Sequence, residues 1–259
     1  DHAIGAPTLI AERLSVREGS ETRRDEVSFT IHAGEILGIV GVSGNGQGAL
    51  GEVLSGLTQP SSGSLSLNGA PAGDLGPRGL IQAGAARVPE ARHAEGAVAD
   101  MSVWENALLE RLRQPEFSTR GFVRQGAARA HARKLLERFD VRGASDQTRI
   151  GLLSGGNMQK LILGRSLATQ PRFILANQPT RGLDEGAIAA VHAELLAARS
   201  AGAAILLISE ELEEAVALSD RIQALVKGRL SRPVAAGQAD ARRLGLMMAG
   251  IWEDESDAA

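Results

Sequence analysis

The chain has 259 residues, 43% of them hydrophobic, and a formal net charge of −3. That length can hold one large domain, or a domain with a subdomain, around a sizeable core. The slight acidic surplus argues against nucleic acid as the main partner, because proteins that follow a phosphate backbone usually carry a basic surplus. The absence of cysteine excludes disulfides and thiolate metal sites, and it fits a reducing compartment.

No apolar run approaches the roughly 20 residues that a helix needs to span a bilayer. No signal-peptide pattern opens the sequence. The chain begins at Asp1 rather than Met, and DHAIGAP, residues 1–7, has the composition of a linker. These features lead us to expect a domain that belongs to a longer protein.

Short β-type runs alternate with helical patterns along the chain. Strands are expected at residues 8–16, 25–33, 35–40, 63–69, 85–89, 172–177, 203–209 and 221–228. Helices are expected at residues 49–57, 102–112, 126–139, 186–202, 210–219 and 239–250. Strands that alternate with helices imply a mostly parallel sheet covered on both faces. Residues 91–170 are richer in Arg and in helical periodicity, which indicates a helical insertion.

The stretch GVSGNGQG, residues 41–48, lies between the apolar run EILGIV and a helical pattern. A strand, a glycine loop and a helix in that order surround an anion with backbone N–H groups. A phosphate-binding loop has Lys and then Ser or Thr where this chain has Gln47 and Gly48. No lysine lies in the first 133 residues to replace the missing one. The motif alone leaves two alternatives open, a phosphate site or a tight strand-to-helix turn.

A second glycine motif, LLSGGNMQKLILGRSL, covers residues 152–167. Its Ser154 is a favourable N-cap, and Gly155 and Gly156 allow the backbone to approach an anion closely. An ordinary capped helix start would explain LSGG on its own. The order of a glycine loop, LSGG, a strand that runs into QPTRGLD and a strand ending in LLIS is much more specific.

With these motifs in this order, the sequence resembles the ATP-binding domains of ABC transporters. It is most similar to the C-terminal of the two nucleotide-binding domains in ATPases of simple-sugar and nucleoside importers. Within that group, GNGQ and QPTRGLD favour the nucleoside branch. The resemblance runs from about residue 8 to 252 and is carried by VPEARHAEG (88–96), SVWEN (102–106), LSGGNMQK (153–160), QPTRGLDEGA (178–187), LLISEELEE (206–214) and LSDRI (218–222).

The resemblance implies the fold class. It is α/β, a P-loop NTPase (ABC-type) nucleotide-binding domain with a mostly parallel sheet, a small N-terminal antiparallel β part and a helical subdomain. We expect a single domain of this type over residues 1–259. Its helical subdomain is expected at about residues 91–168, and a C-terminal helix at about residues 239–250.

The resemblance also implies an ATP site around the first glycine loop. The residues that it assigns to this cofactor site are Gly41, Ser43, Gly44, Asn45, Gly46, Gln47, Gly48, Ala49, Glu90 and Asn177. Gln47 stands where Lys would touch the β- and γ-phosphates, and a neutral amide contributes no full charge there. Gly48 offers no hydroxyl to Mg²⁺, and Asn177 stands where Asp would help to hold the ion.

Two further residues stand at positions that the resemblance makes catalytic. Gln178 replaces the Glu that would orient or deprotonate the attacking water, and an amide is a poor base. Glu210 replaces the His that would contact the γ-phosphate, and a carboxylate repels that group. Near Arg17 and Glu18, where family members often stack an aromatic ring on adenine, the sequence has none. We therefore expect a degenerate hydrolytic site, with ATP as cofactor and any Mg²⁺ weakly held; the alternative is that other residues compensate.

The second glycine motif is intact by comparison. In this family two such domains pack head to tail, and the LSGG of one faces the ATP held by the other. Ser154, Gly155 and Gly156 are present, and Asp184 stands where the family has an inter-domain contact. The resemblance therefore predicts a chain that completes a partner's active site but hydrolyses ATP poorly at its own. Such a chain would be one half of an asymmetric ATPase pair.

The implied function is to energise the uptake of a simple sugar or nucleoside. The implied partners are a second nucleotide-binding domain and transmembrane permease subunits, on the inner face of the cell membrane, with no nucleic acid and no dedicated metal site. The Arg-rich segment 124–138 is read as a solvated face, and Trp104 either as core or as part of a groove for the membrane partner. Two alternatives stay open: a soluble ABC ATPase that acts on ribosomes or DNA, and a structural domain that binds no nucleotide.

Overall fold

The computed structural model describes residues 3–15 and 26–252. Arg17 and Glu18, near the expected adenine position, lie outside the described residues. The chain forms two compact units. Unit 1 comprises Asp1–Arg87, Arg172–Gln178 and Leu196–Ala259, and unit 2 comprises Val88–Pro171 and Pro179–Leu195.

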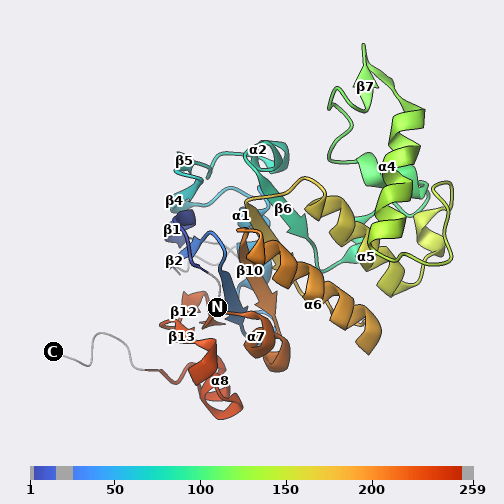
Figure 1. Ribbon diagram of the computed structural model, residues 1–259. Helices are drawn as coiled ribbons and strands as arrows, with labels where there is room; N and C mark the ends of the chain where they lie inside the picture. The colour runs from blue at the N-terminus through green and yellow to red at the C-terminus, as the bar shows by residue number, and fades with distance from the viewer. Residues whose placement is uncertain (1–2, 16–25, 253–259) are drawn as a thin grey trace. The chain divides into compact units, whose positions relative to one another are not determined.

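Unit 1 is built on a mostly parallel sheet (Figure 1). Its strands lie in the order β12 (Arg229–Leu230), β11 (Arg221–Val226), β3 (Ile36–Val40), β10 (Ala204–Ser209), β9 (Phe173–Asn177) and β6 (Ala85–Val88), and β13 (Val234–Ala235) pairs with β11. β3 runs parallel to both β11 and β10, and β10 runs parallel to β9. Every residue of β3 and β10 is buried, as expected for inner strands of a parallel sheet that read as continuous apolar runs.

A smaller antiparallel sheet near the N-terminus completes the β structure of unit 1. It has the order β2 (Glu26–His32), β1 (Pro7–Ser15), β4 (Ser62–Leu67) and β5 (Ala70–Pro71). Along β2, Val27, Phe29 and Ile31 point inward, and they join one core cluster with Leu37 and Leu206 of the parallel sheet. The predicted small antiparallel part is therefore confirmed.

The helices of unit 1 alternate with its strands along the chain and pack on its sheets. They are α1 (Gln47–Leu54), α2 (Pro77–Gln82), α7 (Leu212–Leu218) and α8 (Ala241–Met248). α8 begins after Asp240, whose carboxylate caps it by accepting from the backbone N–H of Arg243 at 2.6 Å. Over residues 3–15 and 26–252, none of the helices combines the length and the apolar character that a bilayer crossing requires.

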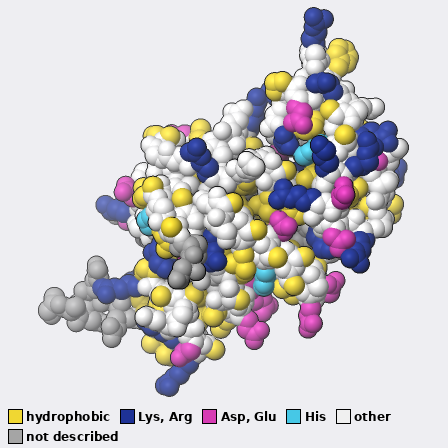
Figure 2. Space-filling view, viewed as in Figure 1, with side chains coloured by type: hydrophobic (Ala, Val, Ile, Leu, Met, Phe, Trp, Pro, Cys, Tyr) yellow, Lys and Arg dark blue, Asp and Glu magenta, His cyan; other side chains and the backbone are white. Residues whose placement is uncertain are grey.

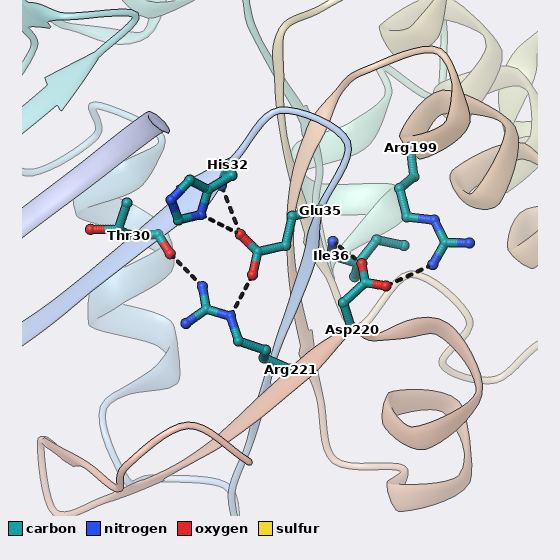
Figure 3. Close-up of polar contacts among 7 residues, drawn as sticks. All are labelled: Thr30, His32, Glu35, Ile36, Arg199, Asp220 and Arg221. Atoms are coloured by element: carbon teal, nitrogen blue, oxygen red, sulfur yellow. Dashed lines mark hydrogen bonds and ion pairs between the residues drawn. The ribbon is translucent and has the colours of Figure 1, made fainter. Parts of the chain in front are cut away.

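Two carboxylates fix the point where β3 begins (Figure 3). Glu35, only 1% exposed, accepts hydrogen bonds of 2.8 Å from the backbone N–H and the Nδ1 of His32, and it pairs with Arg221. Burial raises the pKa of Glu35, but the hydrogen bonds from Arg221 and His32 outweigh burial and hold that pKa below its usual value. Asp220 accepts from the backbone N–H of Ile36 at 2.8 Å. The strand that leads to the first glycine loop is thus held at its first residue.

Unit 2 is mainly helical. It contains a π-helical turn (Arg92–Gly96), α3 (Val103–Leu108), the hairpin β7 (Ser118–Thr119) and β8 (Phe122–Val123), α4 (Gln125–Arg138), α5 (Gly155–Leu167) and the first part of α6 (Glu185–Ser200). α5 is buried along most of its length. Trp104 is half-buried and packs against a cluster of Leu108, Phe117 and Ala128.

The helix expected over residues 102–112 is shorter than predicted. α3 ends at Leu108, and the following N–H groups bond three residues back instead of four. The departure from helical geometry lets the guanidinium of Arg111 lie 4.8 Å from the ring centre of Phe117 and pair with Glu116 at 3.1 Å. A tertiary contact therefore overrides the helical pattern of this segment.

Lys and Arg side chains gather over the part of unit 2 that carries α4 (Figure 2). Arg133 is 58% exposed, so the prediction of a solvated face holds for it. Arg129 and Arg133 both bind Asp146, at 2.6 and 3.2 Å. The hydrogen bond from Arg129 lowers the pKa of Asp146, and part of the basic face is thereby used for contacts inside unit 2.

Candidate functional site

The loop Gly41–Gly48 runs from the carboxyl end of β3 into the first two residues of α1, within unit 1. Gly44 and Gly46 have φ values of 84° and 107°, a left-handed region that favours glycine. A Cβ placed on Gly44 or Gly48 would meet no described atom within 4 Å, so both residues border open space. The first N–H groups of α1 precede its intrahelical bonds and point toward the loop. This geometry fits the phosphate group of a ligand.

The side chain of Gln47 is folded into this loop. It is 8% exposed, its Nε2 donates to the carbonyl of Val42 at 3.0 Å, and its Oε1 accepts from the backbone N–H of Asn45 at 3.1 Å. A Cβ on Gly41 would lie 2.5 Å from the same Nε2. The amide therefore occupies the inside of the loop and engages the backbone N–H of Asn45.

Asn45 fastens the loop to a distant hairpin. Its Oδ1 accepts from the backbone N–H of Lys227 at 3.0 Å, and its carbonyl accepts from the N–H of Gly228 at 3.0 Å. Its Nδ2 donates to Val42 at 2.9 Å. Lys227 and Gly228 form the turn between β11 and β12. The loop thus has its shape fixed by side chains and backbone of the protein itself.

The structure brings three further predicted residues to the same edge of the sheet. Asn177 ends β9, and its Nδ2 lies 3.4 Å from the position of a Cβ on Gly51 of α1. Gln178 is 6% exposed and adopts φ 47°, and its Oε1 accepts from the backbone N–H of Glu210 at 3.3 Å. Gln178 and Glu210 therefore meet just beyond the carboxyl ends of β9 and β10.

The backbone N–H groups of the loop suit a phosphate, whereas the residues at positions 48, 177 and 178 are poor ligands for a magnesium ion. Gly48 has no hydroxyl, and Asn177 and Gln178 offer neutral amide oxygens, of which that of Gln178 is already bonded. Magnesium sites in proteins are usually built on carboxylates. The amide of Gln178 also cannot act as a general base at neutral pH. The loop thus offers backbone donors for an anion, and Glu210 is the one carboxylate among the predicted residues of unit 1 at this edge of the sheet.

The second glycine motif starts α5 within unit 2. The Oγ of Ser154 accepts from the N–H of Asn157 at 3.4 Å, and the N–H groups of Gly155 and Gly156 precede the first intrahelical bond. A Cβ on Gly156 would lie 3.0 Å from the Cβ of Ala187 in α6, so glycine lets the two helix starts pack tightly here. The motif therefore serves packing as well as leaving N–H groups at an open turn.

Asp184, which the resemblance assigns to an inter-domain contact, lies beside this turn. Its Oδ1 accepts from the N–H of Ala187 at 2.8 Å and so caps α6. Its Oδ2 lies 3.8 Å from the position of a Cβ on Gly156. Unit 2 thus brings together Ser154, Gly156 and Asp184.

Glu90 is predicted at the cofactor site, and the structure shows its partner inside unit 2. Its carboxylate forms an ion pair with the guanidinium of Arg181. Two residues that the sequence argument did not single out also reach this turn: Arg92 donates to the carbonyl of Arg181 at 2.8 Å, and Gln159 donates to the carbonyl of Pro179 at 2.7 Å. The opposite charges of Glu90 and Arg181, both in quoted motifs, were the one signal for such a contact.

Residues 24–181 match the family model described as ABC transporter. The chain is 42% identical over 257 residues to the guanosine import ATP-binding protein NupO of Bacillus subtilis, covering 98% of this chain and 50% of NupO. It is 40% identical over 228 residues to the ribose import ATP-binding protein RbsA 3 of Rhizobium etli, covering 88% and 43%. The chain therefore spans about half the length of the curated relatives that it matches.

Solved structures support the same fold. One crystal structure of an ATP-binding cassette of an ABC transporter superposes with a TM-score of 0.76 at 21% identity, covering 96% of this chain and 99% of that one. A nucleotide-free cassette gives a TM-score of 0.74 at 20% identity, covering 96% of each chain. Because the family model covers more than half of the sequence, the chain belongs to the ABC transporter family and has the fold of its ATP-binding cassettes.

Proposed function

We propose that this chain is a nucleotide-binding domain of an ABC importer that takes up a nucleoside or a simple sugar. Relatives at 42% and 40% identity are named for guanosine import and ribose import. Since the chain spans about half the length of those relatives, we include in the proposal a second nucleotide-binding domain and permease subunits as partners, at the inner face of the membrane. One domain over residues 1–259, with its helical subdomain at about 91–168, is part of the same proposal.

Within this importer, the chain supplies its signature turn to the ATP of the second domain, while its own hydrolytic site is degenerate. Ser154, Gly155, Gly156 and Asp184 serve the partner's ATP in this scheme. The observation that supports the asymmetry best is the amide of Gln47, which lies inside the loop and bonds the N–H of Asn45. Any nucleotide phosphate must compete with that amide for the same donor.

A neutral loop of this kind binds nucleotide weakly and without help from a divalent cation. Backbone N–H groups around Gly44, Gly46 and Gly48 hold the phosphates, and Gln47, whose amide bonds Val42 and Asn45, adds no charge. Asn177 and Gln178 are weak ligands for Mg²⁺, because their side-chain oxygens carry no charge. Removal of Mg²⁺ therefore leaves the affinity of this site for ATP almost unchanged.

Calorimetric titration of the chain with ATP, in Mg²⁺ and in EDTA, tests this directly. We expect weak binding of similar affinity in both buffers. A variant with the consensus residues restored (Gln47→Lys, Gly48→Ser, Asn177→Asp, Gln178→Glu, Glu210→His) should bind at least about tenfold more tightly, and only with Mg²⁺, because charge-assisted contacts replace neutral ones. Gln59→Lys, at an exposed position of unit 1, controls for added charge alone.

The asymmetric scheme is wrong if the unaltered chain hydrolyses ATP at the rate of a complete transporter and Gln178→Ala abolishes that rate. A second candidate function, a structural domain that binds no nucleotide, is favoured by the internal bonds that Gln47 and Asn45 already make. No heat and no thermal shift at millimolar ATP would support that candidate. Co-purification with a permease rather than with ribosomes separates the importer from a soluble ABC ATPase.

A further inference from the structure

We propose that Glu90 and Arg92 are positioning residues that hold Arg181, and with it the turn 179–184, against the start of α5. This inference rests on the proposed function, in which the signature turn and Asp184 face the ATP of a second domain. It also gives Glu90 a different task from a contact with a nucleotide of its own domain, because its carboxylate is engaged by Arg181.

The two residues grip Arg181 at two different points. Arg92 Nη1 donates to the carbonyl of Arg181 at 2.8 Å, and Glu90 pairs with its guanidinium. Arg92 Nη2 lies 3.6 Å from the position of a Cβ on Gly182 and 3.8 Å from that of a Cβ on Gly155. The guanidinium of Arg92 therefore sits between the turn and the first residue of α5.

The segment that carries this grip is itself anchored on α5. Arg92 opens a π-helical turn, a rare geometry that is often found at functional sites. At the other end of that turn, the carbonyl of Gly96 accepts from Nη2 of the buried Arg165 at 2.9 Å. A Cβ on Gly96 would lie 2.6 Å from the Cδ1 of Ile162, so this end packs directly on the helix. Arg92 thus reaches the turn from a fixed base.

The turn has its own anchors on the same helix. Gln159, 1% exposed, donates to the carbonyl of Pro179 at 2.7 Å, and a Cβ on Gly156 would lie 3.0 Å from the Cβ of Ala187 at the start of α6. Asp184 caps α6 through the N–H of Ala187. Between these anchors, Glu90 and Arg92 add contacts to Arg181 itself.

The Glu90–Arg181 pair is poorly placed to stabilise the fold as a whole. The side chain of Arg181 is 59% exposed and that of Glu90 is 38% exposed, and ion pairs this exposed contribute little to global stability. Loss of the pair should therefore change the mobility of the turn while leaving the melting temperature nearly unchanged. That difference separates positioning from a role in folding.

The first test needs no partner. Amide hydrogen exchange over residues 179–184 is measured for the chain and for Glu90→Gln and Arg92→Gln, with Arg142→Gln as a control that breaks another exposed pair of unit 2, Arg142–Asp140. We expect exchange at least about threefold faster in both variants, as for local opening that loses one such contact, and no change in the control. The double variant Glu90→Arg with Arg181→Glu should restore slow exchange. Unchanged exchange in Glu90→Gln, whose exposed pair leaves the fold intact, overturns the proposal.

The second test uses the assembled ATPase with its second nucleotide-binding domain. The KM for ATP should rise about threefold to tenfold in Glu90→Gln with kcat nearly unchanged, because the binding-competent turn is then less populated before assembly. The charge-swapped variant should recover the KM. Faster exchange with an unaltered KM would support the positioning of Arg181 by Glu90 and Arg92 but contradict the proposed role of the signature turn. The two proposals can therefore fail separately.

Discussion

The phosphate loop of unit 1 and the signature turn of unit 2 are both glycine-rich entries into a helix, but they treat their N–H groups differently. In the loop, Gln47 returns to bind the N–H of Asn45, and Asn45 is fastened to the β11–β12 turn. At the signature turn, the Oγ of Ser154 makes one long contact of 3.4 Å to Asn157. The described atom nearest to a Cβ on Gly155 is Nη2 of Arg92, 3.8 Å away.

This difference shows how a phosphate loop can lose its charge and keep its shape. An amide has both a donor and an acceptor, so Gln47 bonds a carbonyl and an N–H of the loop that a lysine could not satisfy together. In the described part of unit 2, the Oγ of Ser154 bonds the N–H of Asn157, and the N–H groups of Gly155 and Gly156 precede the first intrahelical bond of α5. The four predictions that follow test this contrast.

The largest expected effect comes from a carboxylate in the open turn. Gly155→Asp should lower ATP hydrolysis by the assembled ATPase at least about 100-fold, because it places negative charge where a phosphate is received. The free energy of unfolding should stay the same or rise, since acidic residues are favourable in the first turn of a helix. Gly155→Ala, which has room at 3.8 Å, is the matched control and should retain most of the activity. Steady-state hydrolysis and urea unfolding measure the two effects, and normal hydrolysis by Gly155→Asp would contradict the role of this turn.

A methyl group in the closed loop should damage the fold instead. A Cβ on Gly41 would lie 2.6 Å from the carbonyl oxygen of Leu225 and 2.5 Å from Nε2 of Gln47. Gly41→Ala should therefore cost about 1–3 kcal/mol in the free energy of unfolding, as overpacking does. Gly245→Ala, where a Cβ meets no described atom within 4 Å, is the control. Equal stability of the two variants in urea unfolding would show that the loop is not packed as described.

Removing the amide from the loop should have a smaller effect on stability. Gln47→Ala breaks the bonds to Val42 and Asn45 at a buried position, which should lower the free energy of unfolding by about 1 kcal/mol. It also frees the N–H of Asn45, so the affinity for ATP should be unchanged or improved. Gln59→Ala is the control at an exposed site. A loss of ATP binding on calorimetry would instead make Gln47 a direct ligand and would remove the contrast with the signature turn.

The smallest effect is a dependence on pH that spares both turns, since neither 41–48 nor 153–157 has a titratable side chain. Burial lowers the pKa of His131, with Arg111 and Lys134 lowering it further and Glu116 opposing them. The unfolded chain then binds the proton more readily than the folded chain. The stability that His131 contributes is therefore complete above its unfolded pKa of 6.5 and is lost as pH falls below that value.

Urea unfolding between about pH 8 and 5.5 should show this decline, and His131→Gln should flatten it in that window. Exchange of the amides in 41–48 and 153–157 should not follow the same titration. A matching pH response of either turn would mean that its N–H groups are linked to a titrating group that the contrast leaves out.

Much of the scaffold could be predicted because buried strands have a recognisable pattern of apolar residues in the sequence. β3, β9 and β10 are continuous apolar runs, and β2 alternates, as inner strands and one-sided strands should. The glycine spacing likewise located both turns. The inward fold of Gln47 could not be predicted, because an amide serves equally well as an internal bond or as a ligand contact.

Long-range contacts account for the other differences. Asn45 binds Lys227 across 182 positions, and Arg181 binds Glu90 across 91. No local pattern encodes such pairs. The early end of α3 has a more local cause, since Arg111 contacts the carboxylate of Glu116 and the ring of Phe117 just after the helix.

The bonds between Asn45 and the β11–β12 turn also bear on the thermodynamics of any ligand. A phosphate loop that is flexible without ligand loses conformational entropy when it closes on a nucleotide, and that loss opposes binding. Here the ordering is already complete in the folded chain, because Lys227 and Gly228 hold Asn45 in place. The loop should therefore bind with little ordering entropy, and the absence of a lysine charge should appear mainly as a weaker enthalpy.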